Sequence, residues 1–215
     1  MNGEKISEIL IKWYKKNKRT FSWRTQELTP FQFLVAELML QKTGANQVEK
    51  IFMNFINKFP TPETIVDAPQ QVLEDEFQPL GLFRRRARDL KRLSESILEK
   101  NGVIPKTQKE LTKLPGVGNY IANAVLCFAF NQNVPLVDAN IARIIERVFT
   151  FQVKGAPTRD KNLWKKVEEL VPSEHVKEFN FALLDLGALI CTPKKPKCDA
   201  CPLNDICDFF TKKLK

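Results

Sequence analysis

The chain has 215 residues, of which 43% are hydrophobic, enough to bury a core without help from disulfides. Lysine and arginine number 34 against 25 acidic residues, so the net charge of +9 favours a polyanionic partner and argues against an acidic protein surface. No run of about 18 apolar residues occurs and the N-terminus MNGEKISEIL lacks the features of a signal peptide, so we expect an intracellular protein without membrane segments.

Apolar residues recur at helical spacing along almost the whole chain. The groups that follow the i, i+3, i+4, i+7 rule are Ile6, Ile9, Leu10 and Trp13; Ala122, Val125, Leu126 and Ala129; Ile141, Ile144, Ile145 and Val148; and Phe179, Ala182, Leu183 and Leu186. Prolines and glycines separate these segments, and the two-residue alternation of strands is hard to find. The pattern predicts an all-α protein.

A strongly apolar helix is predicted after Pro30, in the segment FSWRTQELTPFQFLVAELMLQKT. Glu37 lies within FLVAELML, where burial would disfavour the charged form of its carboxyl group and raise its pKa. A carboxyl group in that state suits a proton donor, or a base that positions water, near neutral pH. The alternative is a structural glutamate that pairs with an arginine or reaches solvent.

Basic residues crowd the segment GLFRRRARDLKR, which has a single acidic residue, Asp89. They are Arg84, Arg85, Arg86, Arg88, Lys91 and Arg92. Such a density is typical of a surface that lines DNA, and we expect these side chains to do so. A solvated helix face is the alternative.

The segment from Leu114 to Asn140 combines a glycine turn with a lone carboxylate. In LPGVGNYIA, Gly116 and Gly118 allow backbone torsions and a close approach that would let the turn amides converge on a phosphate oxygen. Taken alone, this turn could simply join two helices. Further along, Asp138 directly precedes the apolar helix of ANIARIIERVF, where it is a good helix N-cap.

Four of the five cysteines lie near the C-terminal end, in CTPKKPKCDACPLNDIC. Cys191, Cys198, Cys201 and Cys207 form a C-x6-C-x2-C-x5-C pattern that can wrap one compact metal centre. Structural zinc sites usually pair two short C-x2-4-C or H-x-H units, whereas only one C-x2-C and no nearby histidine occur here. This spacing, together with the family resemblance described below, favours an iron-sulfur cluster over zinc or unrelated thiols. Cys127, on the apolar face of its helix, is expected to be a small buried hydrophobe.

Together these motifs resemble the helix-hairpin-helix DNA glycosylase superfamily in its iron-sulfur branch, which includes endonuclease III, MutY-type adenine glycosylases and Mig-type thymine/uracil mismatch glycosylases. The similarity runs from FSWRTQELTPFQFLVAELMLQKT through FNFALLDLGALICTPKKPKCDACPL. It implies two helical domains with a cleft between them for the substrate base. One is a six-helix barrel with the helix-hairpin-helix over residues 22–132; the other is a discontinuous cluster domain from residues 1–21 and 133–215, with a 4Fe-4S loop at 191–207.

The resemblance also implies roles for three side chains. Asp138 matches the essential catalytic carboxylate of the family, which would stabilise the positive charge that develops on the sugar as the N-glycosidic bond breaks. Glu37 matches the glutamate that assists base loss in MutY-type enzymes. Tyr120 stands where bifunctional members carry a Schiff-base lysine, so we expect a monofunctional enzyme that leaves an abasic site.

Contacts with double-stranded DNA are expected from the hairpin, from the basic loop between the first two cluster cysteines, and from residues that fill the gap left by an extruded base. The expected contact residues are Gly116, Val117 and Gly118 in the hairpin, Lys194, Lys195 and Lys197 in the loop, and Gln41, Lys42, Leu82, Phe83 and Arg84 around the extruded base.

Local sequence favours the Mig type over the MutY type. VDAN stands where MutY types usually show DGNV, AVLCFAF is Mig-like, and GLFRRRARDL lacks the usual MutY GYY. We therefore expect a monomer that removes thymine or uracil opposite guanine, in the cytoplasm and associated with the nucleoid. One alternative is an adenine glycosylase that acts opposite guanine or 8-oxoguanine without the C-terminal recognition domain, because the chain stops eight residues after Cys207. An alternative of a different class is a non-catalytic DNA-binding module.

Overall fold

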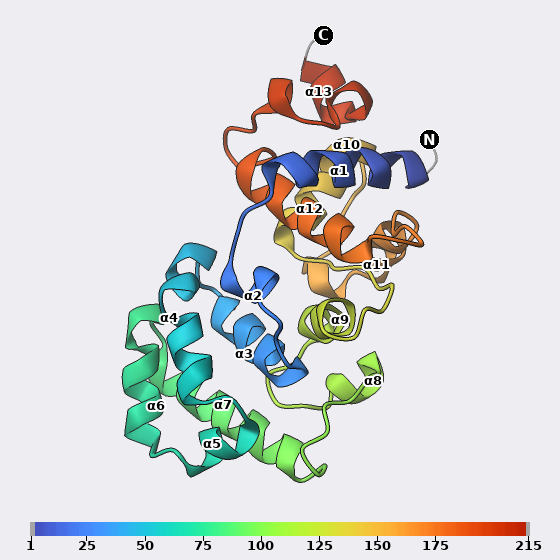
Figure 1. The fold of residues 1–215 in the computed structure, drawn as a ribbon. Coiled ribbons are helices and arrows are strands. Elements are labelled where there is room, and N and C mark those ends of the chain that lie inside the picture. The colour runs from blue at the N-terminus through green and yellow to red at the C-terminus, as the bar shows by residue number, and fades with distance from the viewer. Residues whose placement is uncertain (1–2, 214–215) are drawn as a thin grey trace. The chain divides into compact units, whose positions relative to one another are not determined.

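The computed structural model describes residues 3–213, and within that range every regular element is a helix, which confirms the predicted all-α fold class. The chain divides into two compact units (Figure 1). The first comprises the N-terminal segment up to Arg19 together with the chain from Asn131 onward, and the second comprises Thr20–Phe130. Among the described residues, none of the helices combines the length and hydropathy that crossing a membrane would require.

The second unit contains eight α-helices and one short 3-10 helix. They are α2 (Ser22–Thr25), α3 (Pro30–Leu40), α4 (Ala45–Lys58), α5 (Pro62–Asp67), α6 (Gln70–Phe77), η1 (Gln78–Leu80), α7 (Phe83–Leu98), α8 (Gln108–Leu111) and α9 (Asn119–Phe128). Helix α7 packs against α5 and α6, and α3 packs against α4, α7 and α9. Helix α3 therefore lies at the centre of the unit, which buries most of its surface.

The start of α3 is set by a reciprocal capping box. The Thr29 hydroxyl accepts a hydrogen bond from the Gln32 amide at 3.3 Å, and the Gln32 side chain accepts one from the Thr29 amide at 3.0 Å. Pro30 at the first helical position needs no amide partner and already has a helical φ. The capping box and Pro30 fix where α3 begins, and this start position determines that Glu37 faces inward.

Aromatic side chains form the core of the second unit. Trp23 stacks on Phe21 at a centroid distance of 4.7 Å and meets the edge of Phe52 at 5.7 Å. Phe55 packs against Phe77 at 4.9 Å. Full burial of one such side chain stabilises the fold by about 1.5–3 kcal/mol, so these contacts stabilise the packing of α4 against α2 and α6.

Among its described residues, the first unit contains five α-helices and three short 3-10 helices. They are α1 (Gly3–Asn17), α10 (Ala139–Phe149), η2 (Pro157–Arg159), α11 (Lys161–Glu168), α12 (Val176–Leu189), η3 (Cys198–Ala200), η4 (Asn204–Ile206) and α13 (Asp208–Lys213). Helix α12 packs against both α1 and α10, and α10 also contacts α11 and α13. Buried Asp185 of α12 accepts hydrogen bonds from the Arg19 amide at 2.9 Å and from Arg19 Nε at 2.6 Å, so this pair fixes the segment after α1.

Candidate functional site

Asp138 begins helix α10 with extended backbone torsions, φ −127° and ψ −174°. Its Oδ1 accepts a hydrogen bond from the Ile141 amide at 2.7 Å, which confirms the predicted N-cap. Its Oδ2 accepts one from Asn140 Nδ2 at 3.0 Å. The half-buried carboxylate is thus held by both oxygens at the positive end of an amphipathic helix, where a negative charge is favoured.

A buried amide side chain of α12 holds the segment that leads into Asp138. Asn180 of α12 has no exposed surface, accepts a hydrogen bond from the Leu136 amide at 3.2 Å and donates one to the Val134 carbonyl at 3.0 Å. Leu136 and Val137 are themselves fully buried. Asp138 therefore follows a rigid segment, and its side chain cannot drift away from the start of α10.

A chain of hydrogen bonds connects Asp138 to the first of the four clustered cysteines, and the sequence patterns did not reveal it. The Asn140 side-chain oxygen accepts a hydrogen bond from Arg143 Nη2 at 2.9 Å. Arg143 also donates from Nε to the Cys191 carbonyl at 2.7 Å and from Nη2 to the Gly187 carbonyl at 2.9 Å. Position and orientation of the Asp138 carboxylate are thereby tied to the end of α12.

Helices α10 and α12 approach each other closely at Gly187. A Cβ atom placed on Gly187 would lie 2.6 Å from the Cβ of Asn140, closer than any real contact of this kind. Glycine is therefore required here for a close approach of two helices, and the sequence analysis did not single it out. Its neighbour in the other helix is the residue that holds Asp138.

The four cysteines near the C-terminal end line one cavity in the first unit, together with apolar side chains of α10 and α12. Burial raises the pKa of the Cys201 thiol to about 11, and the proximity of Cys191, Cys207 and Cys198 adds to this shift. Burial likewise raises the pKa of Cys207. The predicted ligands therefore come together in space, in a site that disfavours charged thiolates unless a cation neutralises them.

Within the described part of the chain, no group of three or more histidine, cysteine, aspartate or glutamate side chains is arranged to hold one metal ion. Cys127 is fully buried in α9 in the other unit, as predicted for a small hydrophobe.

Arg147 lines the cysteine cavity and contacts the loop that follows Cys191. Its Nη1 donates to the Cys191 sulfur at 3.3 Å and to the Thr192 carbonyl at 2.8 Å, and its Nη2 donates to the Pro193 carbonyl at 2.9 Å. The guanidinium lies 4.9 Å from the centroid of the Phe209 ring. A permanent positive charge thus stands next to a sulfur that becomes anionic when it binds iron.

In the second unit, the glycine turn joins α8 to α9. Gly116 has a φ of +77°, which only glycine adopts without strain, whereas Gly118 is extended at φ −91° and is the N-cap of α9. Apart from its chain neighbours, no described residue comes within 4 Å of a Cβ placed on Gly118, so the start of α9 is open to a ligand. Val117 is 5% exposed, so any contact it makes with DNA has to come from its backbone.

Glu37 and Tyr120 lie on two packed helices of the second unit. Glu37 is 7% exposed on α3, as its apolar neighbours predicted, and Tyr120 is half-buried in the first turn of α9. Asp138 belongs to the first unit. The joint action of these three residues on one nucleotide stays a prediction, and so does the raised pKa of Glu37.

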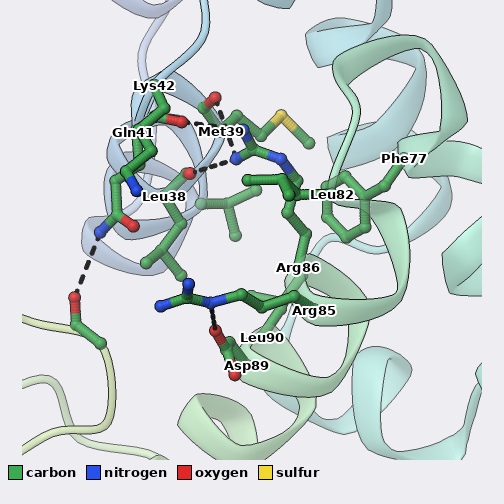
Figure 2. A pocket seen from close by; sticks show the side chains of 12 residues that line it. Leu38, Met39, Gln41, Lys42, Phe77, Leu82, Arg85, Arg86, Asp89 and Leu90 are labelled. Atoms are coloured by element: carbon green, nitrogen blue, oxygen red, sulfur yellow. Dashed lines mark hydrogen bonds and ion pairs between the residues drawn. The ribbon is translucent and has the colours of Figure 1, made fainter.

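A cavity of about 200 Å³ lies between the C-terminal end of α3 and the N-terminal end of α7 (Figure 2). Its lining residues are Val35, Leu38, Met39, Gln41, Lys42, Phe77, Leu82, Arg85, Arg86, Asp89, Leu90 and Gly116. Three residues predicted to contact DNA around an extruded base, Gln41, Lys42 and Leu82, are therefore brought together at one cavity. Phe83 and Arg84 do not line it, and the Arg84 guanidinium instead lies 5.5 Å from the Phe83 ring centroid.

Two of the cavity residues have left-handed backbone torsions although they are not glycine. Lys42 has a φ of +57° and Leu82 a φ of +53°. This conformation costs on the order of 1 kcal/mol for such residues and persists only where the surroundings impose it. Leu82 is also 56% exposed, as an apolar residue that enters a DNA stack would be.

The structure corrects the prediction that Arg86 lines the DNA. Burial lowers the pKa of its guanidinium, which turns inward and donates only to acceptors of the protein itself. Its acceptors are the carbonyls of Leu38, Met39, Gln41 and Gly81 and the hydroxyl of Thr43. Lys91 is also used internally, since its Nζ donates to the Ala68 carbonyl at 2.8 Å. By contrast, Arg84, Arg85 and Arg88 remain exposed.

The basic loop between Cys191 and Cys198 is held by internal hydrogen bonds. Lys194, Lys195 and Lys197 are exposed, while the Thr192 hydroxyl donates to the Lys195 carbonyl at 2.7 Å and the Lys197 amide donates to the Ile190 carbonyl at 2.9 Å. The loop therefore holds three positive charges on a fixed turn rather than on a mobile tail.

Comparison with known families identifies two matching regions. Residues 35–172 match the family described as HhH-GPD superfamily base excision DNA repair protein. Residues 191–207 match the iron-sulfur binding domain of endonuclease III. The second match coincides with the four cysteines that line one cavity, and it confirms the predicted 4Fe-4S site.

Similar proteins cover nearly the whole chain. A thymine/uracil-DNA glycosylase of Pyrobaculum aerophilum is 41% identical over 215 residues, which covers 97% of this chain and 93% of that protein. An adenine DNA glycosylase of Buchnera aphidicola is 34% identical and covers 94% of this chain and 58% of that protein. The solved structure of a thermostable thymine-DNA glycosylase superposes with a TM-score of 0.92 at 33% identity, over 98% of this chain and 97% of that one.

Proposed function

The chain belongs to the HhH-GPD superfamily of base excision DNA repair proteins, and from this premise we propose that it is a monofunctional DNA glycosylase that removes thymine or uracil opposite guanine. The observation that carries the proposal is the Asp138 carboxylate, which two hydrogen bonds hold at the start of α10 within the matched region. The sequence identity is higher to the thymine/uracil enzyme than to the adenine enzyme, which supports the choice of base.

The reaction needs a negative charge near the sugar. As the N-glycosidic bond lengthens, the bonding electrons leave with the base and positive charge develops on the anomeric carbon and ring oxygen. A carboxylate that is already oriented stabilises this charge without reorganising during the reaction. Asp138 meets the requirement, because the Ile141 amide and the Asn140 side chain fix its two oxygens.

Glu37 and Tyr120 complete the proposed chemistry. Glu37, buried on α3, positions the water that attacks the sugar or supplies a proton to the departing base. Tyr120 has no amine and cannot form a Schiff base with the opened sugar. The product is therefore an abasic site in an intact strand.

Three surfaces of the chain bind the DNA in this proposal. The backbone of Gly116, Val117 and Gly118 with the start of α9 binds a phosphate, and the loop that carries Lys194, Lys195 and Lys197 holds a second stretch of backbone. Gln41, Lys42, Leu82 and Phe83, with Arg84 beside them, fill the space that the extruded base leaves.

Cys191, Cys198, Cys201 and Cys207 hold the 4Fe-4S cluster of the first unit. When bound, the cluster supplies iron-thiolate bonds that cross-link the loop at four points. The chain's own residues connect this loop to α10, since Arg143 and Arg147 donate to the Cys191 carbonyl and sulfur. The fixed loop in turn keeps its three lysines in place for the DNA.

The test is incubation with duplexes that carry a single G·T, G·U, A·G or A·8-oxoguanine pair, followed by alkali, which cleaves the strand at any abasic site. We expect cleavage of the thymine- and uracil-containing strands after alkali and none before it. Cleavage only at adenine would favour the adenine glycosylase. Intact strands in every duplex that the protein shifts in a gel would indicate the non-catalytic binding module and refute the proposal.

A further inference from the structure

Arg86 uses its full donor capacity inside the protein. A guanidinium has five N–H groups, and here each has an acceptor. Nε donates to Gly81 O at 2.9 Å, Nη1 to Leu38 O at 2.8 Å and Met39 O at 3.3 Å, and Nη2 to Gln41 O at 2.8 Å and Thr43 Oγ1 at 2.6 Å. Such complete use of one side chain indicates that these acceptors have to keep a fixed mutual arrangement.

The acceptors belong to the two segments that carry the proposed DNA wedge. Leu38, Met39, Gln41 and Thr43 form the end of α3 and the loop after it, and Gly81 directly precedes Leu82 at the start of α7. Figure 2 shows the Arg86 guanidinium beside the backbone of the α3 end, with Leu82 close by. One side chain thus joins two loops that lie about forty residues apart in the sequence.

Both joined segments contain a residue in an unfavourable conformation. Lys42 and Leu82 have left-handed torsions, and each directly follows a residue whose carbonyl accepts a hydrogen bond from Arg86. The same loop is linked to the hairpin, because Gln41 Nε2 donates to the Gly116 carbonyl at 3.3 Å. The contacts of Arg86 therefore hold the loops in torsions that they would leave if unrestrained.

We propose that Arg86 is a positioning residue for base extrusion, which holds Gln41, Lys42 and Leu82 as one rigid wedge before DNA binds. The inference rests on the proposed function. A wedge that is already ordered loses less conformational entropy when it enters the base stack, so the energy of DNA binding goes into unstacking the target. Arg86 itself contacts neither the substrate nor the reacting atoms.

The test compares two substitutions that keep the net charge. Arg86→Lys leaves three donors in place of five and cannot reproduce the planar fork, whereas Arg159→Lys changes an exposed arginine of η2 in the first unit, outside the predicted DNA contacts. Because both variants keep their charge, their affinity for the DNA backbone should stay within about threefold of the parent. Thermal melting curves of the variants are used to choose an assay temperature at which all of them are folded.

Extrusion is measured separately from chemistry by placing each substitution in the Asp138→Asn background. The fluorescence of 2-aminopurine next to a G·U pair reports the extruded fraction at saturating protein. We expect Arg86→Lys to lower this fraction about tenfold and, in the chain that keeps Asp138, to lower the single-turnover rate of uracil release about tenfold. Arg159→Lys should leave both unchanged. Thr43→Val, which removes one of the five acceptors, should lower both about threefold and serves as the milder variant.

The outcomes separate the inference from the function on which it rests. If the parent releases uracil and Arg86→Lys leaves the extruded fraction unchanged, Arg86 has no part in extrusion, even if the rate falls. If the rate and the fraction both stay at the parent's values, the inference is also wrong. If the parent releases no base from any mismatched duplex, the proposed function fails and the inference fails with it.

Discussion

Gly187→Ala should damage activity through Asn140, although Gly187 contacts neither DNA nor the carboxylate. The new Cβ would lie 2.6 Å from Asn140 Cβ, and ordinary contacts of this kind begin at 3.4 Å, so the two helices must separate by 0.8 Å. If α10 moves by that amount, Asp138 at its start moves with it, so the carboxylate is displaced by about 0.8 Å relative to α12. Misplacement of a catalytic group by about 1 Å costs on the order of 100-fold in rate.

The assay combines single-turnover kinetics on a G·U duplex with thermal unfolding. Overpacking costs about 1–3 kcal/mol, and for a chain of this size each kcal/mol lowers Tm by about 2–4 °C. We expect the rate of Gly187→Ala to fall by about 100-fold at a temperature where the variant is fully folded. Gly44→Ala is the matched control, because among the described residues only its chain neighbours come within 4 Å of the added Cβ, and its φ of −67° suits alanine. A lowered Tm with a rate within twofold of the parent would refute the connection from Gly187 through Asn140 to Asp138.

Three further predictions concern other parts of the chain. Tyr120→Lys places an amine where strand-cleaving relatives carry one, so borohydride should trap a covalent adduct with DNA that the parent does not form; its absence would count against the placement of residue 120 beside the sugar. Arg147→Lys removes a forked, charge-assisted hydrogen-bond donor to Cys191, an interaction worth about 1.5–3 kcal/mol. A ferrous chelator should therefore bleach the broad absorbance of the iron-sulfur cluster near ~400 nm roughly tenfold faster in this variant than in the parent. An unchanged rate of bleaching would show that Arg147 does not protect the cluster. Hydrogen bonds from the amides of Lys154, Leu163 and Asn162 lower the pKa of Asp160 in the folded chain. The charged carboxylate therefore stabilises the fold above pH about 3.9, and this stabilisation is lost as the pH falls through the lower folded pKa. The Tm difference between the parent and Asp160→Asn should shrink in acid, and a constant difference would contradict this.

Local features of the fold were the ones that the sequence predicted. The helices follow from apolar residues at 3.6-residue spacing, and the N-cap at Asp138 follows from a carboxylate that directly precedes such a segment. Burial of Glu37 and Cys127 follows from their apolar neighbours along the chain. The grouping of the four cysteines could be inferred because all of them lie within one short loop.

Features that depend on backbone acceptors far away in the sequence could not be predicted. Nothing in the run of basic residues distinguished Arg86, which bonds inside the protein, from its exposed neighbours. Its acceptors are mainly backbone carbonyl groups, which every residue has, so they leave no pattern in the sequence. The same holds for Arg143, whose carbonyl acceptors in α12 and beyond lie more than forty residues away. The role of Gly187 was equally hidden, since a glycine inside a helix indicates a close approach only when the opposing helix is known.

Asp138 can serve both as the N-cap of α10 and as the catalytic carboxylate, and substitution by asparagine separates the two roles. Asparagine caps helices about as well as aspartate, so Asp138→Asn can keep the bond from the Ile141 amide through its side-chain oxygen. Its other terminal atom becomes an amide nitrogen, which cannot accept the hydrogen bond that Asn140 Nδ2 now donates. The variant therefore keeps the start of α10 but loses the negative charge and the link to Asn140. If base release depends on a negative charge next to the sugar, this variant should bind mismatched DNA, melt at a temperature close to the parent's and release no base. Base release at the parent's rate would instead show that Asp138 acts only as a helix cap.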